Sequence, residues 1–277
     1  MSQLYAEVIG DPIAQSKSPV IHNFWLGKLG IAAEYRACHV RGDELAGYFA
    51  DRRSDPQWRG CNITIPHKEA AVRLVDRLDP RVDGIGAVNT VVRQASGTLL
   101  GTNTDIDGVG EAAAGLDLEN RRAVVFGAGG AARATFTFLA GSRCSSVHVF
   151  ARSPDKAKRA IGECGLDADI VPFAPGSGAL EDAALAINAT QLGMKGQAPM
   201  PEFILREVGG MAGNGLVFDM VYAPLETELL KAAARLGLRT SDGLLMLVGQ
   251  AATAFTHFFG VVPPREYDEE LRAMLAG

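Results

Sequence analysis

The chain has 277 residues, a formal net charge of −5 and a hydrophobic fraction of 47%. This length exceeds one average domain, so we expect two domains with ample chain to bury a core. Because the chain is acidic, nucleic acid and anionic membrane surfaces are disfavoured as partners, and small molecules are the expected ligands. The longest apolar stretch, residues 244–259, is interrupted by polar side chains and is too short to span a bilayer.

The cysteines and the N-terminus indicate a cytoplasmic protein. Cys38, Cys61, Cys144 and Cys164 are scattered without any C-x-x-C pair, which argues against a disulfide framework and against a structural zinc site. No cluster of His, Cys and Asp has the spacing of metal ligands, so we expect no metal. The first residues, Met-Ser-Gln-Leu-Tyr, lack the basic and apolar segments of a secretory signal.

Strands and helices are expected to alternate along the first half of the chain, which is typical of an α/β fold. The pattern predicts strands over residues 5–9, 34–40 and 60–65 and helices over residues 19–29, 43–51 and 66–78. A hairpin with arms over residues 87–93 and 98–100 follows, and a helix beyond Gly108 leads into the second half.

The second half is expected to form a separate α/β domain. Strands are predicted over residues 122–126, 147–150, 185–188 and 216–221. A long helix over residues 242–259 and a short closing helix are expected to return to the first domain. We therefore predict a substrate domain of residues 1–107 plus 241–277 and a cofactor domain of residues 108–240.

A glycine turn follows the strand over residues 122–126. Its sequence is Gly127-Ala128-Gly129-Gly130-Ala131-Ala132, and a helix over residues 131–139 comes next. Gly127 permits a tight turn, Gly129 leaves room for a pyrophosphate, and Ala132 lets the helix lie close to the strand. A glycine-rich surface turn is the alternative, but the strand before it and the helix after it favour a dinucleotide site on the helix N-terminus.

The segment after the strand over residues 147–150 predicts the coenzyme. It reads Ala151-Arg152-Ser153-Pro154-Asp155-Lys156, where an NAD site would have an acid for the ribose 2′-hydroxyl. Arg152, Ser153 and Lys156 suit a 2′-phosphate instead, so we predict NADP. Asp155 is the rival ligand, but its place after Pro154 favours a role as a first-turn charge of the next helix.

A lysine occupies an unusual position in the segment Asn62-Ile-Thr64-Ile-Pro66-His67-Lys68. It falls in the first turn of the expected helix over residues 66–78, where the helix dipole opposes a cation and suits Lys68 to proton transfer. A solvated lysine is the alternative. His67 is expected to make a hydrogen bond near the helix start and not to act as a base.

The chain resembles the shikimate dehydrogenase family along nearly its whole length. Seven segments match that family's motifs in order and spacing, namely Ser16-Lys-Ser18-Pro19, residues 62–68, Gly86-Ala-Val-Asn89-Thr90, Asn103-Thr-Asp105-x-x-Gly108, residues 127–134, Asn188-Ala-Thr190-x-x-Gly-Met194 and Asp242-Gly243-x-x-Met246-Leu-x-x-Gln250. The resemblance implies an α/β substrate domain and a Rossmann-like dinucleotide-binding domain with a parallel sheet. It also implies reversible reduction of 3-dehydroshikimate to shikimate with NADP, in aromatic amino-acid biosynthesis. One departure is Ala151, because the family's NADP version has asparagine there.

The residue chemistry fits this reaction. Hydride addition to a ketone builds negative charge on its oxygen, and a cationic acid such as Lys68 can neutralise that charge with a proton. The resemblance implies that Asp105 positions Lys68 and binds the neighbouring hydroxyl, with an Asx-turn or helix cap as the alternative role. It further implies cofactor contacts from Thr190, Met194 and Gly243.

The resemblance also implies the substrate-binding residues. They are mostly neutral hydrogen-bonding side chains, as a ring with a carboxylate and three oxygen substituents requires: Ser16, Ser18, Asn62, Thr64, Asn89, Tyr222 and Gln250. Structural roles are the alternatives for three of them, since Ser18 could be a helix N-cap, Thr64 a strand residue and Tyr222 a cover for the sheet edge. Gln250 lies on a small, polar stripe of its helix, as expected beside a polar site.

We therefore predict an NADP-dependent oxidoreductase that acts on the CH–OH group of shikimate, working as a monomer or homodimer. A quinate or mixed quinate/shikimate dehydrogenase using NAD(P) is the alternative within the same class. The resemblance implies that the serine at position 18 goes with shikimate, because quinate-preferring relatives tend to carry threonine there. A catalytically idle shikimate-binding regulator is the alternative of another class, and the presence of both Lys68 and Asp105 counts against it.

Overall fold

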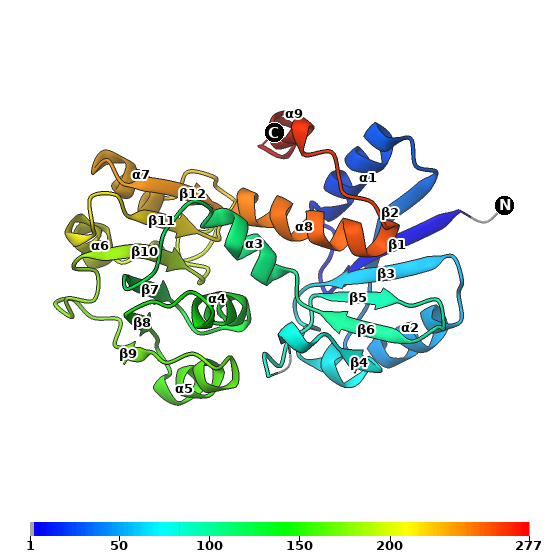
Figure 1. Cartoon of the computed structure of the whole chain (residues 1–277), viewed down its shortest axis with the longest axis horizontal. Helices are drawn as coiled ribbons and strands as arrows, with labels where there is room; N and C mark the ends of the chain where they lie inside the picture. Colours follow the sequence, from blue (N-terminus) through cyan, green and yellow to red (C-terminus); the bar gives the residue numbers. More distant parts are fainter. Residues whose placement is uncertain (1–2, 83, 277) are drawn as a thin grey trace. The chain divides into compact units, whose positions relative to one another are not determined.

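The computed structural model describes residues 3–82 and 84–276. It divides into two compact units (Figure 1): unit 1 comprises Met1–Thr104 and Gln250–Gly277, and unit 2 comprises Asp105–Gly249. Within the described residues no helix is both long enough and apolar enough to cross a bilayer.

Unit 1 is built on a mixed six-stranded sheet with the order β2-β1-β3-β5-β6-β4. The strands β1, β2 and β3 run parallel to one another, while β5 pairs antiparallel with both β3 and β6, and β4 pairs parallel with β6. Their bounds are β1 (Leu4–Gly10), β2 (Ala33–His39), β3 (Trp58–Ile63), β4 (Arg77–Leu78), β5 (Thr90–Arg93) and β6 (Leu99–Thr102).

Two hydrophobic layers cover this sheet. On one face, Tyr48 and Phe49 of α2 (Leu45–Arg53) pack with Trp58 in a buried cluster. A second, aromatic layer joins α1 (Ser18–Leu29) to α8 (Gly243–Phe259), with the rings of Trp25 and Phe255 5.5 Å apart. The closing helix α9 (Asp268–Ala276) packs against α1. Two 3₁₀ helices precede the hairpin and one precedes α9: Ala70–Arg73, Pro80–Val82 and Arg265–Tyr267.

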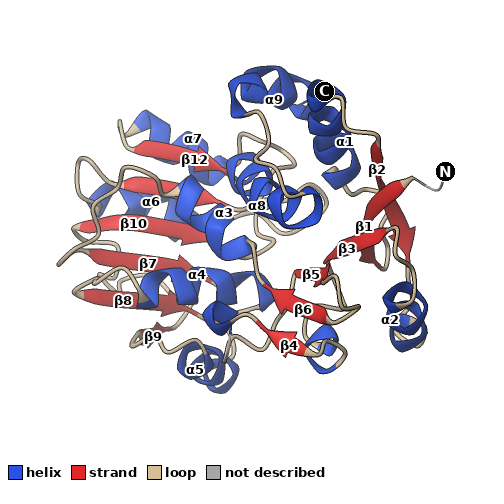
Figure 2. Cartoon of the chain, turned by 45° about the vertical axis from the view of Figure 1, so that its right-hand side comes forward, coloured by secondary structure: helices blue, strands red, loops and turns tan. Residues whose placement is uncertain are grey.

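Unit 2 contains a six-stranded, fully parallel sheet with the order β12-β11-β10-β7-β8-β9 (Figure 2). From the β9 edge this is the strand order 3-2-1-4-5-6 of the Rossmann fold. The bounds are β7 (Arg122–Phe126), β8 (Ser146–Phe150), β9 (Asp169–Val171), β10 (Ala183–Asn188), β11 (Leu216–Asp219) and β12 (Arg239–Asp242).

Helices cover both faces of the unit 2 sheet, as the buried, almost entirely apolar strands require. One core lies under α3 (Asp105–Ala112), α4 (Gly130–Ala140) and α5 (Pro154–Glu163). The other lies under α6 (Glu202–Glu207) and α7 (Glu228–Arg235), and the 3₁₀ helix Val208–Gly210 follows α6. The α/β fold class and the Rossmann-like parallel sheet are thereby confirmed.

The prediction of a helix over residues 66–78 is wrong. The chain makes turns after Ile63, then the short 3₁₀ helix Ala70–Arg73, and then enters β4. Pairing of β4 with β6, including Arg77 opposite Leu100, takes this segment into the sheet. Tertiary pairing thus overrides the local helical pattern, and the helix-dipole argument for Lys68 does not apply.

Candidate active site and coenzyme site

The end of β1 holds the lysine segment of unit 1 in place. The Thr64 N–H donates to the Ile9 carbonyl at 3.0 Å, and the Asp11 N–H donates to the Ile65 carbonyl at 3.1 Å. A Cβ on Gly10 would lie 2.5 Å from Thr64 Cγ2, so only glycine allows this close approach. The loop over residues 64–68 is therefore fixed beside the carboxyl ends of β1 and β3.

Lys68 follows in a turn and is half-buried. Its carbonyl accepts a 2.9 Å hydrogen bond from the Val88 N–H, which ties the lysine to the segment that carries Asn89. His67 is buried and its Nε2 lies 2.6 Å from the Val40 carbonyl, so this ring nitrogen carries the proton and donates. The expectation that His67 is a hydrogen-bonding residue and not a base agrees with this contact.

A continuous chain of buried hydrogen bonds joins three of the predicted substrate residues. Asn62 Nδ2 donates to Thr90 Oγ1 at 2.9 Å, and Thr90 Oγ1 donates to Asn89 Oδ1 at 2.8 Å. The Thr104 N–H donates to the same Asn89 oxygen at 2.7 Å, and Thr104 Oγ1 donates to Gln250 Oε1 at 3.4 Å. All five side chains are buried. The structure thus brings the predicted residues Asn62, Asn89 and Gln250 together. Thr90 and Thr104, which were not predicted, connect them by hydrogen bonds.

The serine pair lies at the start of α1. Ser18 is the first residue of the helix and Lys17 is its N-cap, so the alternative role of Ser18 as N-cap is wrong. Ser16 Oγ accepts a 3.4 Å hydrogen bond from the Ser18 N–H. The Lys17 ammonium is anchored on the Leu275 carbonyl. These contacts fix the segment that carries both serine hydroxyls, from the loop at Ser16 to the first residue of α1 at Ser18.

Asp105 and Tyr222 belong to unit 2. Asp105 is the first residue of α3 and supplies negative charge to its first turn, a favourable place for an acid. Tyr222 follows β11, is half-buried, and has its pKa raised by that burial.

The glycine turn of unit 2 has the geometry expected of a dinucleotide site. Gly127 has φ 102°, a region that favours glycine, and a Cβ there would lie 2.6 Å from Thr190 Cγ2. Gly129 is the N-cap of α4, and a Cβ there would meet no protein atom within 4 Å. The open space at Gly129 and the unpaired N–H groups of the α4 N-terminus fit a pyrophosphate. Ala132 is fully buried against the sheet.

A buried polar network supports the loop that follows β10. Asn188 Oδ1 accepts from Thr190 N at 3.0 Å and Thr190 Oγ1 at 2.6 Å, and Asn188 Nδ2 donates to Asp219 at 2.8 Å. Asp219 also accepts from Val221 N and from Thr227 Oγ1. Burial raises the pKa of Asp219, while these hydrogen bonds favour its charged form. The network holds the Thr190 methyl against the glycine turn, and Met194 lies further along this half-buried loop.

The start of α8 lies very close to the end of β11. A Cβ on Gly243 would be 2.2 Å from the Met220 carbonyl oxygen, so no other residue fits there without a backbone shift. Asp242 caps the helix, accepting from the Leu244 N–H at 3.0 Å and the Leu245 N–H at 3.3 Å.

The predicted 2′-phosphate residues surround the start of α5. Arg152, Ser153 and Lys156 are all exposed, and Ser153 is the N-cap although its hydroxyl makes no capping bond. Pro154 occupies the first turn together with Asp155, as predicted. Exposed basic side chains at a helix N-terminus present donors to a phosphate.

The sequence interpretation missed several residues of these sites. Thr90 and Thr104 lie inside recognised segments but were given no role, and Asp219 lies in a strand that suggested only core. Tyr35 was not singled out, although its hydroxyl donates to Asn62 Oδ1 at 2.6 Å. Sequence offers no signal for Tyr35, because the contact joins residues 27 positions apart.

Comparison with known proteins places these sites in context. The model for "Shikimate dehydrogenase substrate binding domain" matches residues 8–91, and that for "Shikimate 5'-dehydrogenase C-terminal domain" matches residues 243–271. The shikimate dehydrogenase (NADP(+)) of Sphingopyxis alaskensis is 51% identical over 98% of this chain and 96% of the relative. The shikimate dehydrogenase (NADP(+)) of Rhodospirillum rubrum is 41% identical over 98% of this chain and 96% of the relative.

Solved structures agree with these relatives. Shikimate 5-dehydrogenase from Thermus thermophilus, in complex with NADP(H) and shikimate, aligns with a TM-score of 0.84 and 36% identity, covering 98% of this chain and 99% of that one. The enzyme from Listeria monocytogenes, in complex with shikimate and NAD, aligns with a TM-score of 0.87 and 29% identity, covering 99% and 96%.

Proposed function

The chain belongs to the shikimate dehydrogenase family, and we propose that Lys68 and Asp105 carry its reaction, the reversible reduction of 3-dehydroshikimate to shikimate. It is an NADP-dependent oxidoreductase that acts on a CH–OH group. The observation that supports the residue assignment best is the buried chain of neutral hydrogen-bonding groups from Asn62 to Gln250, tied to the Lys68 main chain through Val88.

Lys68 is the proton donor in this proposal. NADPH, when bound, supplies the hydride that forms the new C–H bond at the ketone carbon. As the C=O bond becomes a single bond, the Lys68 ammonium transfers a proton to the oxygen, and neutral Lys68 then regains a proton from water. In the direction of oxidation, neutral Lys68 removes the hydroxyl proton. Asp105 binds the neighbouring hydroxyl and orients the ring.

Neutral side chains bind the rest of the substrate. We assign the contacts to Ser16, Ser18, Asn62, Thr64, Asn89, Tyr222 and Gln250. The hydrogen-bond chain supports this role, because it engages both the oxygen and the nitrogen of the Asn89 amide and the oxygen of the Gln250 amide, and thereby orients both side chains. A site that is ordered before binding loses less entropy on binding.

The coenzyme contacts are assigned to unit 2. The pyrophosphate is placed at the glycine turn, on Gly127, Ala128, Gly129, Gly130 and Ala131, and the 2′-phosphate on Arg152, Ser153 and Lys156. Thr190, Met194 and Gly243 complete the set. The Thr190 hydroxyl donates to Asn188 and accepts from the Leu192 N–H, so its contribution is to pack its methyl group beside Gly127.

Initial rates with shikimate and with quinate, each against NADP⁺ and NAD⁺, test the function. Ser18 leads us to expect shikimate, because quinate has an additional ring hydroxyl that a shikimate site would crowd or leave unpaired. A kcat/KM for quinate equal to that for shikimate would contradict this choice.

We further propose a cytoplasmic enzyme that acts as a monomer or homodimer. All four cysteines are free thiols, which suits a reducing compartment. Light scattering coupled to size-exclusion chromatography measures the mass, and a trimer or larger assembly would contradict the proposed state.

A further inference from the structure

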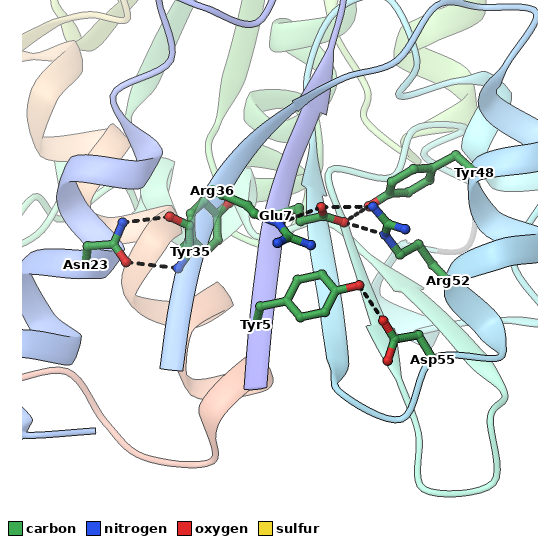
Figure 3. Close-up of polar contacts among 8 residues, drawn as sticks. All are labelled: Tyr5, Glu7, Asn23, Tyr35, Arg36, Tyr48, Arg52 and Asp55. Atoms are coloured by element: carbon green, nitrogen blue, oxygen red, sulfur yellow. Dashed lines mark hydrogen bonds and ion pairs between the residues drawn. The ribbon is translucent and has the colours of Figure 1, made fainter. Parts of the chain in front are cut away.

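The main chain of Tyr35 on β2 is held by a side chain from α1. Asn23 Nδ2 donates to the Tyr35 carbonyl at 2.6 Å, and the Tyr35 N–H donates to Asn23 Oδ1 at 2.9 Å. Figure 3 shows this pair of hydrogen bonds at the strand. Any displacement of the Tyr35 main chain relative to α1 would therefore break both hydrogen bonds.

The ring of Tyr35 is fixed as firmly as its main chain. It stacks on the ring of His22 at a centroid distance of 3.9 Å and an interplanar angle of 4°. Both side chains are buried, Tyr35 with 1% and His22 with 0% exposure. Neither nitrogen of His22 has a hydrogen-bond partner in the described part of the chain, and burial lowers its pKa to about 3. His22 is thus a neutral ring on which the Tyr35 ring stacks.

The fixed main chain and ring of Tyr35 determine the position of its hydroxyl group. It donates to Asn62 Oδ1 at 2.6 Å, and burial raises the pKa of Tyr35 well above its usual range, so the proton stays on the tyrosine. An amide oxygen that accepts from Tyr35 leaves the Asn62 nitrogen to donate to Thr90 Oγ1. The Thr90 hydroxyl, having accepted from Asn62, donates onward to Asn89 Oδ1 at 2.8 Å, which is nearer than its other neighbour Thr104 Oγ1 at 3.2 Å.

We propose that Tyr35 is a positioning residue for substrate binding, which sets the orientation of the Asn62 amide and, through Thr90, supports the Asn89 amide that the Thr104 N–H also holds. The inference rests on the proposed function, because Asn62 and Asn89 are substrate residues only under that function. Tyr35 itself does not contact the substrate in this scheme. Its effect must therefore pass through Asn62.

Tyr35→Phe tests the proposal, since it removes the hydroxyl and keeps the ring on His22. We expect the KM for shikimate to rise about three- to tenfold, the effect of one neutral hydrogen bond, with the KM for NADP⁺ unchanged. Tyr48→Phe is the matched control. Tyr48 is also a buried tyrosine of unit 1, but its hydroxyl donates to Glu7 at 2.8 Å (Figure 3). Its loss should lower Tm and leave both KM values unchanged.

A double-mutant cycle separates positioning from a general loss of stability. In an Asn62→Ala background, Tyr35→Phe should change the KM for shikimate by less than about twofold, because its partner is gone. A folded Tyr35→Phe variant with the wild-type KM for shikimate overturns the proposal, as does an equal rise in both KM values. A wild-type protein that cannot turn over shikimate contradicts the proposed function itself, and the role of Tyr35 falls with it.

Discussion

The methyl group of Thr190 occupies the space beside Gly127, where an added Cβ would lie only 2.6 Å from Thr190 Cγ2. The loop after β10 and the glycine turn after β7 are thus fitted to each other, although they lie far apart in the sequence. This packing and the open space at Gly129 predict different outcomes for two substitutions in one turn.

Gly127→Ala should lower both the stability of unit 2 and the affinity for NADP⁺, because a φ of 102° strains alanine by about 1–3 kcal/mol and its methyl group meets Thr190. Gly129→Ala should lower the affinity alone, since its Cβ meets no protein atom. Thermal unfolding and coenzyme titration by fluorescence measure the two effects. Unchanged NADP⁺ binding in Gly129→Ala would show that the pyrophosphate does not approach this position.

Lys68→Ala should lower kcat about 10²-fold or more, the usual range for a general acid–base group, with coenzyme binding and the fold retained. Asp105→Asn should act similarly. Lys28→Ala is the matched control, because Lys28 is paired with Glu270 at 2.7 Å and has no assigned catalytic role. Steady-state rates and circular dichroism are the measurements. A near-normal kcat in a folded Lys68 variant would refute the assignment.

Arg152→Ala should weaken NADP⁺ binding by about 1.5–3 kcal/mol, the range of charge-assisted hydrogen bonds, and weaken NAD⁺ binding far less. The wild-type enzyme should prefer NADP⁺ by about tenfold or more in kcat/KM, which corresponds to about 1.4 kcal/mol. Lys158→Ala, an exposed lysine further along α5, should leave the preference intact. An Arg152 variant that still discriminates like the wild type would show that other residues bind the 2′-phosphate.

The stability of unit 1 should fall as the pH is lowered below about 6.5, because His22 is held neutral in the fold. Its pKa is lowered by burial to about 3 from a usual value of 6.5, so in this window the unfolded chain binds a proton that the folded chain does not. One such group reduces the unfolding free energy by about 1.4 kcal/mol per pH unit.

His22→Phe should remove that contribution and keep a ring beside Tyr35. Urea unfolding at pH 7 and at pH 5, followed by tryptophan fluorescence, gives the unfolding free energy at each pH. The difference between the two values should be smaller in the variant than in the wild type. Both tryptophans, Trp25 and Trp58, are buried in unit 1, so their signal reports on this unit. An identical loss of stability between the two pH values in wild type and variant would contradict the prediction.

Local patterns predicted much of unit 2. The bounds of β7 match the expected strand over residues 122–126, because a buried apolar run ending in a glycine turn leaves few alternatives. The short strands β9 and β12 were not predicted. Each pairs with a single neighbour at an edge of the sheet, so it carries little apolar pattern of its own.

Long-range contacts account for what the sequence could not predict in unit 1. Residues 66–78 carry a helical pattern, yet Arg77 and Leu78 pair with β6. Asn62 was recognised from its motif, whereas Tyr35 acquires its role only when β2 and β3 lie on either side of β1. Motif spacing identifies the residues that face a ligand more readily than those that hold them in place.

The path of the chain also bears on its synthesis. Unit 2 is one continuous segment, but unit 1 needs residues 250–277, which leave the ribosome after all of unit 2. Until then, Trp25 and His22 lack Phe255, which lies 5.5 Å and 5.8 Å from them in the finished fold. The first hundred residues therefore spend most of translation with an uncovered aromatic surface, the kind of surface that chaperones protect from aggregation.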